Sequence, residues 1–418
     1  MAKKDNQELR SIRPTDAVKV LRRCMQVGRP AMLWGPPGIG KSDIIAQIGA
    51  KENRPVIDLR LLLMEPTDIK GIPFYDPQTG SMEWAKPSEL PGIVSESDVA
   101  EAQAAMEAAT VALGSDADVN PQVVRGMARN IANLQASHEL QNAILFLDEI
   151  NAAPQSVQAA AYQLILNRKV GTYHLPEGIS IVAAGNRETD KAVTFRMPSA
   201  LANRFVHFDM MVNFDDWEDW AIKNRIASDV IGFLKVKQNF LFNFDPKSGD
   251  KAFATPRSWA FVSQLLDDSM DEHLNAVMVQ GTVGAGVAHE FMQHRRLKGK
   301  LPNPKDILTG KVTELPPNRE VDSSAKYSLM VAMCYVLEQM QEEYKNDDKK
   351  TSKDWDKVTD TFLEFIMGKT KGEDHFLAEM VIMGAVVALR KYDIEFNSDT
   401  KTFGKFFEEY HKWIVSTD

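Results

Sequence analysis

The sequence predicts an α/β fold for about the first 210 residues, with a parallel sheet flanked by helices, followed by a mostly helical second half. Three observations support this prediction. Residues 30–34, 143–147 and 179–184 are short apolar runs without polar alternation, which is typical of strands buried on both faces of a parallel sheet. Stretches with helical spacing separate these runs. Beyond about residue 215, strand-like runs are few.

The size and composition of the chain fit a multidomain globular protein. Its 418 residues suggest two or three domains. The apolar fraction of 44% allows a buried core, and the charged fraction of 26% is ordinary for a soluble protein. A formal net charge of −9 argues against binding nucleic acid over the whole surface, although a local basic region stays compatible with it.

Cysteine usage and the N-terminus indicate the compartment. Cys24 and Cys334 lie far apart and form no metal-binding spacing, so we interpret them as buried thiols in a reducing compartment. The chain begins with polar residues, and no uninterrupted apolar run of about 18 residues occurs in it. We therefore expect a cytoplasmic protein that does not enter the membrane.

The first elements form a strand–loop–helix unit. Residues 30–34 stop at a glycine-rich turn, and residues 42–48 have helical spacing. Residues 55–59 are the next predicted strand, and the runs at 143–147 and 179–184 are two more.

Three segments interrupt this α/β pattern. Residues 72–84 and 167–175 each place turn residues between apolar flanks and are predicted hairpins, the first with Phe74 and Tyr75 at its tip. Residues 95–141 are rich in Ala, Glu and Gln, with a polar break at 114–118, and predict an inserted helical hairpin.

Helices dominate the remaining sequence. Proline-containing segments at 301–304 and 315–318 indicate a boundary, and the charged stretch 345–350 is interpreted as a solvated loop. The predicted domains are residues 1–212, 213–300 and 301–418. The helices predicted in the second half cover residues 216–234, 256–268, 323–343 and 375–391.

Residues 35–42 fit the phosphate-loop pattern G-x-x-x-x-G-K-[ST], with a strand before and a helix after, as the motif requires. The glycines let backbone N–H groups turn towards phosphates, and the helix N-terminus adds positive potential. Lys41 would neutralise the β- and γ-phosphates, and the Ser42 hydroxyl would ligate Mg²⁺. The nucleotide-binding residues expected here are Gly35, Pro36, Pro37, Gly38, Ile39, Gly40, Lys41, Ser42 and Asp43.

An apolar strand that ends in Asp148 and Glu149 follows further along the chain. With a phosphate loop before it, this pattern predicts a hydrolytic site for ATP. Asp148 would hold the Mg²⁺, and Glu149 would orient and polarise the attacking water, because phosphoryl transfer depends mainly on positioning and charge stabilisation.

Three further polar residues are candidates for the ATP site because of the order in which they follow the other motifs along the chain. Asn186 ends the next strand, and ligands of parallel sheets lie at the carboxyl ends of strands, so it could bind the γ-phosphate or the water. Arg204, in Asn203-Arg204-Phe205, and Arg257, in Pro256-Arg257, are weak signals individually, because surface arginines are usually only solvated.

Together, this order of motifs resembles the AAA+ ATPases and, among them, the MoxR-like group of the helix-2-insert clade. Residues 65–71 and 74–84 are similar to the segment before the helix-2 insert and to the insert hairpin. Residues 147–154 are similar to the group's Walker B strand and helix cap, and residues 168–175 to the hairpin before sensor 1. Residues 194–205 are similar to the segment that ends in Asp-Arg-Phe, with Asn203 in place of the aspartate.

The resemblance covers about residues 12–300 and implies a ring, usually a hexamer, that uses ATP and Mg²⁺. It implies that Asn186 is sensor 1, that Arg204 is an arginine finger for the neighbouring subunit, and that Arg257 is sensor 2 on a helical lid. It also implies a chaperone-like remodelling motor that moves its insert hairpin and often works with a von Willebrand factor A domain protein. The insertion at 95–141 and the region after residue 301 depart from the resemblance.

Two alternatives remain open from the sequence. A nucleic-acid motor could use the basic cluster at residues 294–300 to contact phosphates, although such a cluster is more often a solvated helix end and the net charge argues against this role. A non-enzymatic ring could bind ATP only for assembly. The retention of Lys41, Asp148, Glu149 and Arg204 argues against that second alternative.

Overall fold

The structure, a computed structural model, describes residues 11–78, 80–85, 87, 90–113, 121–187, 190, 195, 197–317, 320–346 and 351–415. It consists of two compact units, residues 1–212 and 213–418. The polar break expected at 114–118, most of the loop expected at 345–350, and Thr194 and Arg196 lie outside the described residues.

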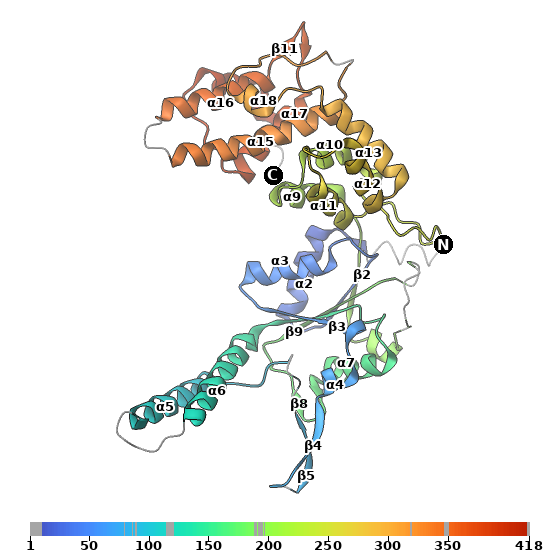
Figure 1. The fold of residues 1–418 in the computed structure, drawn as a ribbon, viewed down its shortest axis with the longest axis vertical. Helices are drawn as coiled ribbons and strands as arrows, with labels where there is room; N and C mark the ends of the chain where they lie inside the picture. The colour runs from blue at the N-terminus through green and yellow to red at the C-terminus, as the bar shows by residue number, and fades with distance from the viewer. Residues whose placement is uncertain are drawn as a thin grey trace. The chain divides into compact units, whose positions relative to one another are not determined.

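A six-stranded parallel sheet forms the centre of the first unit (Figure 1). The predicted strands are confirmed with shifts of about one residue, and so is the predicted α/β fold. The two strands of this sheet that the sequence analysis missed are β1 and β10. In sheet order, the strands are β1 (Ser11–Ile12), β10 (Val206–Met210), β2 (Ala31–Trp34), β9 (Ser180–Gly185), β6 (Ile144–Asp148) and β3 (Val56–Arg60).

The central strands are buried on both faces because helices cover each side. Leu145 and Leu147 of β6 join one core with helix α7 (Gln155–Asn167) and helix α4 (Pro66–Lys70). The alternate residues of β6 point to the opposite face, where α2 (Pro14–Gln26) and α3 (Lys41–Glu52) contact the sheet. The continuous apolar runs in the sequence therefore reflect this two-sided burial.

Three antiparallel pairs extend the first unit, and all three hairpin predictions are confirmed. They are β4 (Ile72–Asp76) with β5 (Ser81–Ala85), β7 (Lys169–Val170) with β8 (Tyr173–His174), and α5 (Glu96–Leu113) with α6 (Pro121–Glu139). Figure 1 shows the α5–α6 hairpin and the β4–β5 hairpin projecting from the sheet.

The expectation that Phe74 and Tyr75 form the tip of the first hairpin is wrong. Both residues lie within β4, where Phe74 is opposite Glu83 and Tyr75 is opposite Met82. Pairing continues to Asp76, so the turn itself falls on the residues that follow. Shorter elements of this unit are the 3₁₀ turns Leu61–Leu63 and Leu140–Asn142 and helix α8 (Ser199–Ala202).

The second unit is mainly helical. The single helix predicted at 216–234 is wrong, because α9 and α10 are separated at residues 224–227, where Arg225 has a φ of 56°. The helices are α9 (Phe214–Lys223), α10 (Ser228–Val236), α11 (Pro256–Leu265), α12 (Glu272–Val283), α13 (Ala285–Lys298), α14 (Pro304–Leu308), α15 (Ser323–Lys345), α16 (Ser352–Ile366), α17 (Ala378–Val386), which a π turn extends to Lys391, and α18 (Lys401–Val415). A 3₁₀ turn at Gln238–Phe240 and the short pair β11 (Lys369–Thr370) and β12 (Glu373–Asp374) complete it.

Helix α15 organises this second unit. It packs against α10, α13, α14 and α17. The Tyr335 hydroxyl donates a hydrogen bond to the Ile226 carbonyl at 2.9 Å, and the Tyr327 hydroxyl donates to the Glu218 carboxylate. Helices on both sides of the expected boundary at residue 300 therefore share one core.

No helix in the described part of the chain is long and apolar enough to cross a membrane.

Candidate functional site

The loop between β2 and α3 has the backbone geometry of a phosphate cradle. Gly38 and Gly40 have φ values of 76° and 91°, a left-handed conformation that glycine adopts without steric cost. Gly40 is the N-cap of α3, and no side chain caps the N-terminus of this helix. The first backbone N–H groups of α3 can therefore bind an anion, and the helix dipole also favours negative charge at this end of the helix.

The ammonium group of Lys41 lies inside this loop. Its Nζ donates to the carbonyls of Gly35 at 2.7 Å and of Pro36 at 2.9 Å. It also donates to Oδ1 of Asn186 at 3.2 Å. The structure therefore brings the lysine of the loop and the asparagine at the end of β9 together, as the sequence analysis expected of a shared site.

The Ser42 hydroxyl and the Asp148 carboxylate meet beside the loop. Ser42 Oγ donates to Asp148 Oδ2 at 3.0 Å. Hydroxyl and carboxylate oxygens are ligands that Mg²⁺ accepts, and Mg²⁺ commonly takes few protein ligands beside phosphates and waters. The donor set therefore fits a magnesium ion held jointly with a nucleotide.

Glu149 follows Asp148 in an unusual backbone conformation. Its φ is 54°, in the left-handed region that non-glycine residues seldom occupy. The other oxygen of Asp148, Oδ1, accepts the Glu149 N–H at 2.9 Å, which stabilises this turn. Glu149 is half-buried. Positions with such backbone strain are common at functional sites.

The sequence analysis missed two charged neighbours on β3. Asp58 and Arg60 occupy the outward alternate positions of this strand, and Arg60 pairs in register with Asp148. Burial and the nearby Asp148 charge raise the pKa of the Asp58 carboxyl, while Arg60 opposes this shift. The alternation of polar residues in the predicted strand at 55–59 was the signal that could have indicated them.

The two candidate arginines are exposed, each in its own unit. Arg204 follows α8, and the described residues provide its guanidinium with no hydrogen-bond or ion-pair partner. Arg257 is the second residue of α11, whose start is fixed by a capping box of Thr255 and Ser258. The roles assigned to both arginines remain predictions.

Both arginines of the basic cluster at 294–300 are paired with carboxylates of the second unit. His294 is buried and bonds to the hydroxyls of Ser324 and Ser328. Arg295 pairs with Asp229 at 3.0 Å and with Asp268, and Arg296 pairs with Glu272 at 2.5 Å. Paired arginines offer less charge to a phosphate backbone, so the structure weakens the nucleic-acid alternative.

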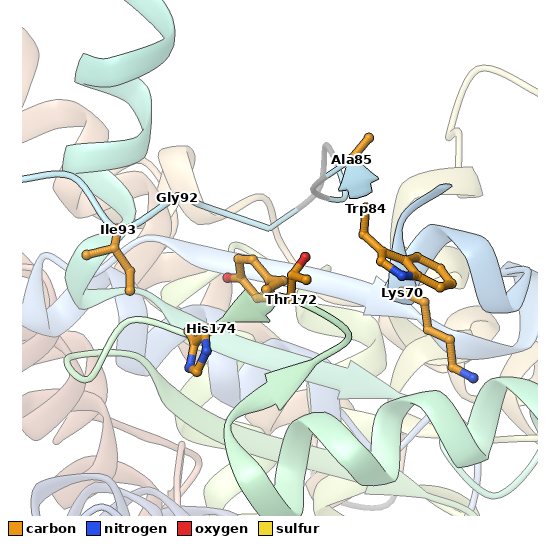
Figure 2. Close-up of a pocket in the computed structure, with 8 residues that line it drawn as sticks. Lys70, Trp84, Ala85, Gly92, Ile93, Thr172 and His174 are labelled. Carbon is orange, nitrogen blue, oxygen red and sulfur yellow. The ribbon is translucent and has the colours of Figure 1, made fainter. Parts of the chain in front are cut away.

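A cavity of about 290 Å³ lies where the β4–β5 hairpin and the β7–β8 hairpin approach each other. Figure 2 shows Trp84 and Lys70 towards one end of this cavity, Ile93 towards the other, and Thr172 between them. The β4–β5 hairpin beside this cavity exposes large apolar side chains, with 63% of Ile72, 60% of Tyr75 and 62% of Met82 accessible to solvent. Exposed apolar groups of this kind are common at protein contact surfaces.

The loop, the paired acidic strand and the parallel sheet define the class of this protein as a P-loop nucleotide-binding enzyme. Residues 31–214 match the model of the ATPase family associated with various cellular activities (AAA). This region is therefore an AAA ATPase domain, and the chain is an enzyme that binds and hydrolyses ATP.

Solved structures with similar arrangements have low sequence identity to this chain. A candidate ATPase from Cytophaga hutchinsonii is 12% identical, with 97% of this chain and 93% of that chain covered and a TM-score of 0.29. A point mutant of RuvB from Thermotoga maritima is 12% identical, with 71% and 74% covered and a TM-score of 0.31. NtrX from Brucella abortus in complex with ADP is 13% identical, with 82% and 68% covered and a TM-score of 0.32. The family model, and not these structures, supports the assignment.

Proposed function

We propose that this ATPase is a MoxR-type remodelling enzyme that works as a ring on a partner protein. The observation that supports this proposal best is the gathering of Lys41, Ser42, Asp148 and Asn186 around one loop, while Arg204 lies exposed without a partner among the described residues. A hydrolytic set without its own arginine suits a site that a neighbouring subunit completes.

In the proposed mechanism, the N–H groups of the loop and the ammonium group of Lys41 bind the β- and γ-phosphates. Ser42 and Asp148 would hold a magnesium ion, which would supply charge neutralisation at the phosphates. Glu149 orients the attacking water and accepts its proton. The Asn186 amide holds the water or the γ-phosphate in line for attack.

Assembly would complete this site. AAA+ ATPases generally form rings, and we propose that Arg204 reaches the ATP of the adjacent subunit and stabilises charge in the transition state. Such a contribution is worth on the order of 10³-fold in rate. Arg257, at the start of α11, would be sensor 2, on a helical lid at residues 213–300.

The β4–β5 hairpin is the proposed contact with the remodelled protein. Ile72 and Phe74 lie on one face of β4 and Tyr75 on the other, and all three side chains are exposed. A two-stranded ribbon that exposes large apolar side chains on both faces can contact an unfolded or partly opened client without a specific sequence. A von Willebrand factor A domain protein is the proposed type of partner that delivers such a client.

A substrate-trap experiment tests this proposal. The Glu149→Gln variant, loaded with ATP and Mg²⁺, should form a ring measurable by light scattering and should retain a client and a von Willebrand-type partner on affinity capture. The matched control, Lys41→Ala, cannot bind the nucleotide and should retain neither. Equal capture by the two variants, or a Glu149→Gln variant that stays monomeric with ATP, would contradict the remodelling function.

A further inference from the structure

The buried carboxamide of Asn151 forms two hydrogen bonds to the main chain of Asn186. Its Nδ2 donates to the Asn186 carbonyl at 2.7 Å, and its Oδ1 accepts the Asn186 N–H at 3.3 Å. Asn151 is only 3% exposed, so water cannot replace these bonds easily. Both ends of the side chain are therefore engaged by one residue, which fixes the position of that residue at two points.

The neighbouring backbone is shaped for this contact. A Cβ atom on Gly185 would lie 2.5 Å from Asn151 Oδ1, so only glycine at the end of β9 allows the side chain to approach. The Ile150 N–H donates to the Ala184 carbonyl at 3.1 Å, and the Asn151 carbonyl accepts the Phe195 N–H at 2.6 Å. Residues 150 and 151 thus attach the turn after Asp148 and Glu149 to the end of β9.

We propose that Asn151 is a positioning residue for ATP hydrolysis. It lies three residues after Asp148 and holds the main chain of Asn186, whose Oδ1 is 3.2 Å from Lys41 Nζ. Asn151 therefore sets the distance between the Asn186 amide and the acidic pair by holding the main chain of Asn186. This inference rests on the role proposed for Asn186.

A residue nearby offers a matched control for the structural effect of substitution. Gln158 of α7 is another carboxamide that is 3% exposed in the same unit. Its Nε2 donates to the Ala153 carbonyl at 2.9 Å, and its Oε1 accepts from the Tyr162 hydroxyl. Gln158→Glu and Asn151→Asp make the same chemical change, but only the latter places a carboxylate oxygen against the Asn186 carbonyl.

The experiment measures steady-state kcat, nucleotide affinity and Tm for Asn151→Asp, Asn151→Ala, Gln158→Glu, Asn186→Ala and the double variant Asn151→Asp/Asn186→Ala. We expect both Asn151 variants to lower kcat by about 10- to 100-fold, which is typical when a group that orients a site residue is lost. Nucleotide affinity should stay close to the wild-type value, because Lys41 and the loop are intact. Gln158→Glu should lower Tm with little change in kcat.

The double variant separates positioning from general destabilisation. If Asn151 acts through Asn186, Asn151→Asp should lower kcat no further in the Asn186→Ala background. The inference would be overturned if the kcat losses of Asn151→Asp and Asn186→Ala multiply in the double variant. It would also be overturned if Gln158→Glu loses as much kcat per degree of lost Tm as the Asn151 variants do. Unchanged kcat in Asn151→Asp and Asn151→Ala beside an impaired Asn186→Ala would overturn this inference alone. Unchanged kcat in Asn186→Ala would also overturn the role proposed for Asn186.

Discussion

At the scale of single residues, the turn at Asp148 and Glu149 is the most constrained part of the site. The left-handed backbone of Glu149 is stabilised by a hydrogen bond to the side chain of the preceding aspartate. That same aspartate accepts the Ser42 hydroxyl through its other oxygen. Asp148 thus supports the geometry of the turn as well as the proposed magnesium site, and a substitution there would disturb both.

Substitution of Glu149 should therefore separate ATP binding from ATP turnover more cleanly than substitution of Asp148. Glu149→Gln keeps the shape of the side chain but cannot accept a proton from water, so we expect turnover to fall at least about 100-fold. ATP affinity, measured by fluorescence titration with a labelled nucleotide, should stay near that of the wild type. Residual turnover close to wild type would show that another group is the base.

A second prediction at this scale concerns His375 in the second unit. This residue is 2% exposed; its Nδ1 donates to the Phe365 carbonyl, and its Nε2 lies 2.8 Å from Thr370 Oγ1. Desolvation, together with the Lys326 charge, lowers the pKa of His375, although the Phe365 carbonyl, Glu314 and Asp374 oppose the shift. The imidazole is therefore buried in its neutral form.

The sign of the pH dependence follows from this shift. Below the unfolded-state pKa of about 6.5, the unfolded chain binds a proton that the folded chain binds less readily, so stability falls as pH falls through this range. The Tm of the wild type should drop between pH 7.5 and 5.5 more than that of His375→Gln. His138, an exposed histidine of α6, provides the control, because His138→Gln should keep the wild-type pH dependence. An equal drop in wild type and His375→Gln would contradict this prediction.

At the scale of elements, sequence patterns predicted long and regular segments better than short ones. The buried strands, both β-hairpins and the α5–α6 hairpin were predictable because apolar runs and turn residues identify them. Strand β1 has only two residues, and β10 alternates polar and apolar residues at a partly exposed position, so neither has the apolar run of a buried strand. The break between α9 and α10 depends on the backbone at Arg225, which local periodicity does not reveal.

The α5–α6 hairpin should be dispensable for hydrolysis. Its helices pack mainly on each other, and at its base the Gln141 Nε2 donates to the Gly92 carbonyl at 2.6 Å. The two ends are therefore close enough for a short Gly-Ser linker to replace residues 95–139. We expect this deletion to retain basal ATP turnover and to weaken capture of partner proteins.

Circular dichroism and the turnover assay provide the controls for this deletion. Helical signal should fall only by the share of the removed helices, with the cooperative thermal transition retained. Loss of soluble, folded protein would contradict the view of this hairpin as a peripheral element.

At the scale of the whole molecule, the order of motifs along the chain predicted the site better than any single motif did. Lys41, Ser42, Asp148 and Asn186 converge because the carboxyl ends of parallel strands meet at one edge of the sheet. Asn151, Asp58 and Arg60 were not predicted, because contacts between segments far apart in the sequence, and not a motif, place them beside the site. The shared core around α15 was not predicted for the same reason.

Ring assembly makes a prediction about mixtures of inactive subunits. Lys41→Ala should be inactive because it cannot bind ATP, and Arg204→Ala should lose on the order of 10³-fold in rate because its neighbours lack the finger. When the two are mixed, some interfaces combine an intact phosphate loop with an intact Arg204. Partial recovery of turnover in the mixture is therefore expected. No recovery at any ratio, under conditions where subunits exchange, would contradict a site shared between subunits.

The effect of DNA and RNA on ATP turnover at different salt concentrations tests the alternative that this protein is a nucleic-acid motor. Because Arg295 and Arg296 are already paired with carboxylates, we expect neither DNA nor RNA to stimulate turnover at low ionic strength. A stimulation that fades as salt is added would indicate a nucleic-acid motor instead. Protein-free and polyanion-containing reactions are the controls.

The single core around α15 has a thermodynamic consequence. This helix has 23 residues and is therefore about 35 Å long, and it packs on α10 and α13 before residue 300 as well as on α14 and α17 after it. The helices before and after residue 300 are therefore expected to unfold in one cooperative transition within residues 213–418.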